Sequence, residues 1–184
     1  MLKQDSPEKP VKKAKKIALC AILSALSTLI LFLGAVFDIF SIASVAVAAL
    51  FICAVMIEIG SPYPFLVWGV TSALSLILLP NKLPAILYAL FGGIYPILKE
   101  HFERLHYLVA WPLKFSVFNC SLFLIILLTK HIFYLNDSEI DFTIPVIILG
   151  NIAFLLTDIA LSKLIRLYLV KIRRHMGITN YFEN

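Results

Sequence analysis

The chain has 184 residues, of which 61% are hydrophobic and only 15% are charged, and its mean hydropathy is +0.95. Soluble globular proteins are typically about 45–50% apolar and about 25% charged, so this composition argues against a soluble fold. The formal net charge of +5 does not indicate nucleic-acid binding, because the basic residues collect near the chain ends, where membrane topology explains them. We therefore expect an all-α membrane protein whose main solvent is the lipid bilayer.

Six apolar runs are candidates for membrane-spanning helices, which need about 20 mostly apolar residues each. In chain order the predicted spans are residues 17–36, 41–57, 62–79, 83–98, 108–129 and 144–161, the last continuing as a basic amphipathic helix to 170. The first run exceeds the apolar region of about 7–15 residues in a signal peptide, so we expect it to be retained. The expected organisation is a basic tail over 1–16, a transmembrane domain over 17–170 and a second tail over 171–184.

The distribution of Lys and Arg predicts the orientation of these spans. With the N-terminus in the cytoplasm, 13 of the 16 basic residues fall on the cytoplasmic side, including Lys99 in an expected loop over 99–107. Only Lys82 and Lys130 fall outside. Cytoplasmic loops carry an excess of Lys and Arg. The sequence therefore predicts a multi-pass protein of the cell membrane, with both termini in the cytoplasm.

Motifs of several enzyme classes are absent from the sequence. It contains no GxxxxGK[ST] phosphate-binding loop, no HExxH zinc-protease motif and no GxSxG nucleophile elbow. The four histidines show no metal-ligand spacing, and the three cysteines fall inside apolar runs, where we expect them to act as small packing residues. We expect no enzymatic activity, no metal and no cofactor.

Two ionisable residues lie within the predicted spans. Lys114 is near the start of the fifth span and Asp158 is near the end of the sixth, so both should lie close to the cytoplasmic surface. An ionisable side chain at membrane depth is normally paired inside the bundle. We expect an ion pair that joins the two spans; a gate or a proton relay is the alternative role.

Five polar residues of the outer half are candidates for a substrate-binding pocket. Asn119 and Asn151 lie within the fifth and sixth spans, Tyr88 lies in the fourth, and Asn81 and Lys82 lie on the outer turn before it. The alternative is that the asparagines only hydrogen-bond between helices, a contact that contributes about 0.6 kcal/mol on average. The sequence leaves both interpretations open.

Small residues recur along the start of the first span at spacings of four, three and four. They are Ala14, Ala18, Ala21 and Ala25. This spacing puts the four methyl groups on one face of a helix, where a second helix can approach closely. The face is expected either to pack within the bundle or to dock a separate helical partner.

A family resemblance rests on the opening KKIALCAILSALSTLIL, on six spans in 184 residues and on two cytoplasmic termini. In these features the chain resembles the substrate-binding S component of energy-coupling factor transporters. The stretch LLPNKLPAILYALFGGIYPILKEHFERL is similar to uncharacterised bacterial membrane proteins of that type. The resemblance implies capture of a vitamin or other micronutrient from outside, in a pocket built from spans four to six and the outer loops. It also implies a transmembrane coupling subunit and ATPase subunits as partners, with the alanine face as the docking surface.

A second function belongs to a different class of protein. Bundles that resemble S components also occur in non-transporting membrane scaffolds and cell-envelope assembly proteins. An apolar outer half without convergent polar groups would favour that function, whereas a bound small molecule would favour transport.

Overall fold

The structure is a computed structural model that describes residues 10–103, 106–131 and 144–167. Within these ranges every regular element is a helix and no strand occurs, so the predicted all-α class is confirmed for the described residues. Residues 1–9 of the predicted N-terminal tail, most of the predicted loop before the sixth span and the tail over 171–184 lie outside the described residues.

The helical elements follow the predicted apolar runs closely, with one exception at the fourth run. They are α1 (Pro10–Val36), η1 (Asp38–Phe40), α2 (Ser41–Glu58), α3 (Tyr63–Leu78), α4 (Leu83–Leu87), η2 (Tyr88–Gly92), α5 (Tyr95–Phe102), α6 (Tyr107–His131) and α7 (Ile144–Leu167). The predicted tail over 1–16 is helical from Pro10 onward, because Lys favours helix and Pro suits its first turn.

The fourth predicted span is broken into three short pieces rather than forming one helix. Between α4 and α5 the chain widens into the π-helical turn η2, where the Gly93 amide donates to the Tyr88 carbonyl at 2.7 Å. Pro96 then lies in the first turn of α5, where its missing amide costs no helical hydrogen bond. Such wide turns are frequent at functional sites.

Three segments of the described chain are long and apolar enough to cross a membrane: Lys13–Val36, Asp38–Glu58 and Leu108–Thr129. Large apolar side chains also point away from the protein on several helices, and Ile42 and Leu108 are 77% and 72% exposed. Soluble proteins rarely expose apolar patches this extensive. Length, composition and surface together indicate a membrane protein.

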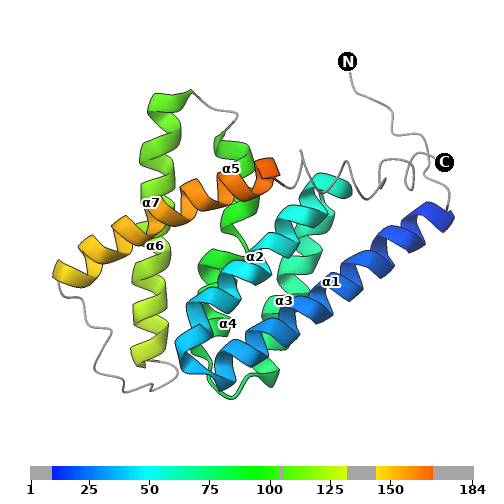
Figure 1. The fold of residues 1–184 in the computed structure, drawn as a ribbon, viewed down its shortest axis with the longest axis horizontal. Helices are drawn as coiled ribbons and strands as arrows, with labels where there is room; N and C mark the ends of the chain where they lie inside the picture. The colour runs from blue at the N-terminus through cyan, green and yellow to red at the C-terminus, as the bar shows by residue number, and fades with distance from the viewer. Residues whose placement is uncertain (1–9, 104–105, 132–143, 168–184) are drawn as a thin grey trace.

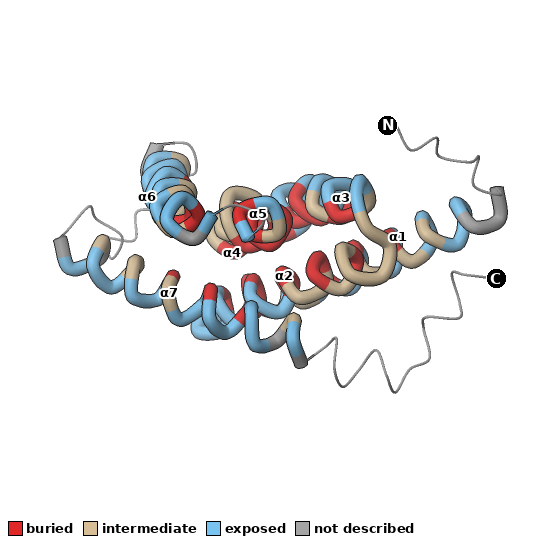
Figure 2. Tube along the Cα trace, turned by 90° about the horizontal axis from the view of Figure 1, so that it is seen from above, coloured by how far each residue is buried: buried red, intermediate tan, exposed pale blue. Residues whose placement is uncertain are grey.

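The helices form two layers, which Figure 2 shows edge-on: α2 and α7 lie in one, and α3, α5 and α6 lie in the other. α1 packs against both α2 and α3 (Figure 1). The contact with α2 depends on Gly34, since a Cβ atom there would lie 2.0 Å from Ser44 Oγ. Ser41 Oγ also donates to the Gly34 carbonyl at 3.1 Å, which fastens the α1–α2 turn.

Candidate functional site

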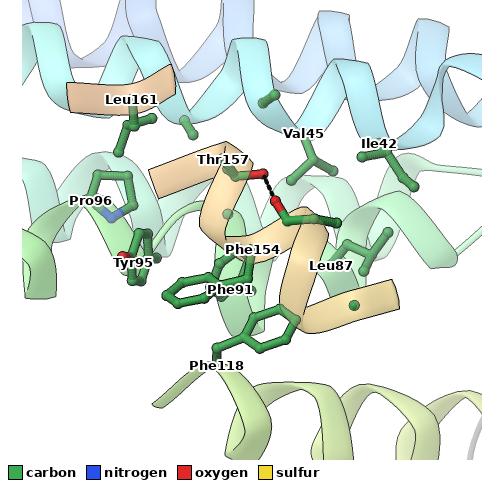
Figure 3. Close-up of a pocket in the computed structure, with 15 residues that line it drawn as sticks. Ile42, Val45, Leu87, Phe91, Tyr95, Pro96, Phe118, Phe154, Thr157 and Leu161 are labelled. Carbon is green, nitrogen blue, oxygen red and sulfur yellow. Dashed lines mark hydrogen bonds between the residues drawn. The ribbon is translucent and has the colours of Figure 1, made fainter. Parts of the chain in front are cut away.

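A cavity of about 200 Å³ lies between the two layers, where α2, the η2–α5 segment, α6 and α7 meet. Val45 and Ala49 of α2 form one wall, and the opposite wall is aromatic. Figure 3 shows the aromatic side chains gathered on that side. They are Phe91 of η2, Tyr95 of α5, Phe118 of α6 and Phe154 of α7.

Phe154 is the centre of this aromatic wall, and it is 1% exposed. Its ring centroid lies 4.7 Å from that of Phe118, 5.3 Å from Tyr95 and 6.0 Å from Phe91. Rings at these separations attract one another through both dispersion and their quadrupoles. The cluster therefore ties α7 to α5, η2 and α6 beside the cavity.

The π-helical turn η2 positions the backbone that closes the cavity toward α2. A Cβ atom on Gly92 would lie 2.3 Å from Val45 Cγ1, so only glycine permits this approach. The Gly92 and Val45 positions both line the cavity. Phe91 therefore contributes its ring to the cavity wall, and Gly92 allows α2 to approach the η2 backbone closely.

The hydroxyl groups on the cavity wall are already engaged. Thr157 Oγ1 donates to the Ala153 carbonyl at 2.8 Å, the contact drawn in Figure 3. Tyr95 Oη donates to Asp158 Oδ1 at 2.6 Å. The side chains of the wall thus present apolar surface, and an occupant must match that surface because a polar group buried without a partner is costly.

A buried ionic cluster lies next to the cavity and joins α5, α6 and α7. Lys99 Nζ donates to Asp158 Oδ1, and Lys114 Nζ lies 3.2 Å from Asp158 Oδ2. The side chains of Lys99, Lys114 and Asp158 are 2%, 7% and 6% exposed. Ser162 Oγ lies 2.7 Å from Lys99 Nζ. Glu103, which is 54% exposed, lies 3.6 Å from Lys99 and 3.8 Å from Lys114.

The structure thus brings together the two residues that the sequence analysis paired, Lys114 and Asp158, and adds a third. Lys99 was expected in a cytoplasmic loop, but α5 continues to Phe102 and buries it, so that prediction is wrong. The missed signal is the four-residue spacing of Tyr95 and Lys99, which puts both on one face of a helix. Both side chains contact Asp158.

The five polar residues of the outer half do not assemble into one pocket. Asn119 and Asn151 bond reciprocally at 3.1 and 3.2 Å. Asn81 instead donates to Asp38 Oδ1 at 2.9 Å, and Lys82 donates to the Leu79 carbonyl at 2.6 Å.

Tyr88 is separated from the other four in a different way, because it is fully buried in the apolar core between α2 and α3. None of the five residues is part of the cavity wall. The structure therefore does not show the expected convergence. Both asparagines are instead engaged in hydrogen bonds within their own helices and with each other.

The alanine face of α1 is turned away from the rest of the described chain. Ala14, Ala18, Ala21 and Ala25 are all exposed. α1 uses a different face to contact its neighbours, on which Ser24, Ser27 and Leu31 are buried. The small residues are therefore not used for packing against α2 and α3.

Comparisons with protein-family models, with curated proteins and with solved structures find no match for this chain. Within the ranges that the structure describes, no group of three or more His, Cys, Asp or Glu side chains is placed to hold a metal ion. The candidate site is therefore defined by its geometry: an apolar aromatic cavity bordered by a buried ionic cluster.

Proposed function

We propose that this chain is a multi-pass membrane protein that captures a small, mainly apolar molecule, as the substrate-binding subunit of a transporter of the energy-coupling factor type. In this proposal the six spans are α1, α2, α3, the α4–α5 segment, α6 and α7. Both termini lie in the cytoplasm. The strong bias of Lys and Arg toward that side supports the orientation.

The cavity beside Phe154 is the observation that carries the proposal. A dry apolar cavity of about 150 Å³ is large enough to bind benzene or xenon, and this one is about 200 Å³. Water entering it would find few hydrogen-bond partners, because the wall hydroxyls of Tyr95 and Thr157 are engaged. The occupant that fits is a flat apolar ring or the apolar part of a micronutrient, rather than a highly polar vitamin.

Two further features agree with a capture subunit that depends on partners. The sequence carries no phosphate-binding loop, so energy for transport would come from separate ATPase subunits. The exposed alanine face of α1 offers a surface on which a helix of a coupling subunit can pack closely. The alanine face is distant in sequence from the aromatic wall, so docking and capture would use different residues.

A non-transporting membrane scaffold is the second candidate, and one observation favours it. The polar side chains of the outer half bond within separate helix pairs instead of converging on a ligand. In a scaffold the cavity would be a packing defect with no specific occupant.

Extraction of the full chain under gentle conditions, followed by mass spectrometry of bound small molecules and co-purified proteins, tests the proposal. Ala49 lines the cavity, so Ala49→Leu should fill it. Ala43→Leu, on an exposed position of the same helix, is the matched control. We expect the parent chain and the control variant to retain a bound small molecule, and Ala49→Leu to lose it. ATPase subunits should co-purify with the parent chain. Absence of both the small molecule and the ATPase subunits would favour the scaffold.

A further inference from the structure

We propose that a second pocket, formed where α6 begins and α7 ends, binds the phosphate headgroup of an anionic phospholipid. The pocket has a volume of about 430 Å³. Its wall consists of Glu103, Ala110, Trp111, Lys114, Asp158, Ile159, Ser162 and Lys163. Its wall shares no residue with the wall of the apolar cavity, although Tyr95 of that cavity donates a hydrogen bond to Asp158. This site rests on the orientation in the proposed function, because it must face the cytoplasmic leaflet, but it does not depend on transport.

The location of the pocket suits a headgroup. Lys114 lies two turns after the start of α6 at Tyr107, and Lys163 lies one turn before the last described residue of α7. Ends of membrane helices lie at the level of the lipid headgroups, where tryptophan is enriched. Trp111 occupies this level on α6, and the Lys114 ammonium lies 5.4 Å from the centre of its ring.

The charge balance of the pocket leaves room for an anion. The ionic cluster that borders the pocket holds the buried ammonium groups of Lys99 and Lys114 but only one buried carboxylate, that of Asp158. Glu103 supplies the remaining negative charge from a half-exposed position, at 3.6 and 3.8 Å. Hydrogen bonds between an ammonium and an anionic oxygen are among the stronger ones, so a phosphate that reaches Lys114 would be stabilised there.

Lys114 is the cation of the cluster with the weaker contacts. Its Nζ lies 3.2 and 3.4 Å from the two oxygens of Asp158 and 3.8 Å from Glu103. Oδ1 of that carboxylate is shared with Lys99 and Tyr95, which are closer. Lys114 therefore keeps donor capacity toward the pocket, and a phosphate would replace the more exposed of its two carboxylate partners, Glu103.

Lys163 and the apolar part of the wall favour a lipid over free phosphate. The Lys163 side chain is exposed at the pocket and can reach a second phosphate oxygen. Ala110 and Ile159 offer apolar surface to the glycerol and the first methylenes of a lipid. The cytoplasmic leaflet carries anionic lipids, and each Lys or Arg near its surface contributes about 1 kcal/mol of attraction.

Trp111 provides a direct readout, because the chain has only two tryptophans and a Trp68→Phe background leaves Trp111 alone. The full chain is placed in bilayers of phosphatidylcholine with a small fraction of brominated lipid, which quenches tryptophan on contact. We expect stronger quenching by brominated phosphatidylglycerol than by brominated phosphatidylcholine. Lys163→Gln should lower that preference about fivefold, the factor that corresponds to one basic residue at an anionic surface.

Lys13→Gln is the matched control, because it removes the same charge from an exposed position on α1, away from α6 and α7 (Figure 1). It should leave the preference at Trp111 unchanged. Equal quenching by the two lipids, or equal losses in the two variants, would overturn the proposal. If millimolar inorganic phosphate abolishes the extra quenching by brominated phosphatidylglycerol, the pocket binds anions but its ligand is soluble phosphate, and the lipid proposal fails.

Discussion

Tyr95 contacts both parts of the candidate site: its ring forms part of the cavity wall, and its hydroxyl donates a 2.6 Å hydrogen bond to Asp158. Asp158 in turn binds Lys99 of α5 and Lys114 of α6. An occupant of the cavity that moves the ring would therefore alter the hydrogen bonding of the carboxylate. The apolar cavity and the ionic cluster are linked through this one side chain.

Tyr95→Phe should separate the two roles of Tyr95. The ring stays in the cavity wall, but Asp158 loses a hydrogen bond. Because the acceptor is charged, the expected loss in the free energy of unfolding is about 1.5–3 kcal/mol. Chemical unfolding in micelles measures it, with Tyr88→Phe as the control, since Tyr88 is equally buried but bonds to no charged group. Equal losses in the two variants would contradict the assigned role of Tyr95.

The ionic cluster should respond to substitution as a unit of three charges. Removing Asp158 alone leaves two buried lysines with only the half-exposed Glu103 near them, so Asp158→Leu should destabilise the protein by roughly the 3–5 kcal/mol expected for breaking a buried pair. Lys114→Met should cost less, because its contacts are longer.

Combined variants test the same cluster more stringently. Lys114→Met/Asp158→Leu leaves Lys99 buried with only the half-exposed Glu103 beside it, so it should recover part of the loss. Adding Lys99→Met should recover more, because buried ionic groups replaced by apolar residues of similar size are often neutral or stabilising. A triple variant less stable than Asp158→Leu alone would refute this expectation.

The predicted topology can be tested by cysteine labelling of intact cells. In a background where Cys20, Cys53 and Cys120 are replaced by Ser, a membrane-impermeant maleimide should label Ser138→Cys and should not label Ser6→Cys. The reason is the positive-inside bias, which predicts a cytoplasmic N-terminal tail and an external loop before the sixth predicted span. Labelling of Ser6→Cys from outside would exclude the proposed orientation.

The exposed alanine face of α1 predicts a selective loss of partner binding. Ala21→Leu/Ala25→Leu adds bulk at exposed positions and keeps the surface apolar, so insertion and folding should be preserved. Overpacking a close helix contact typically costs about 1–3 kcal/mol, so co-purification with a coupling subunit should fall. Binding of the small molecule proposed for the apolar cavity should be retained, because the two alanines are not part of its wall. A folded variant that recovers its partners as well as the parent would show that docking occurs elsewhere.

Much of the secondary structure could be predicted from the sequence, because apolar runs and turn residues are local signals. The runs from Ser41, Tyr63 and Ile144 became helices within one residue of the expected start. The fourth run was harder to predict, since a wide turn such as η2 depends on how Gly92 meets Val45 across the bundle. Lys99 was equally hard to place, because a lysine that follows an apolar run is typical of a loop. Its burial depends on Asp158, which lies on a distant helix.

The sequence by itself therefore indicated a helical membrane protein and showed which ionisable residues lie within the apolar runs. Hydropathy, helix length and basic-residue bias are properties of contiguous segments. It also paired Lys114 with Asp158, because few charges lie within apolar runs and each needs a partner. Only the tertiary structure decided that the polar residues of the outer half do not converge on one pocket and that four aromatic rings form one wall of a cavity. Those outcomes depend on helix crossing and side-chain direction, which bring together residues such as Tyr95 and Phe154 that are distant along the chain.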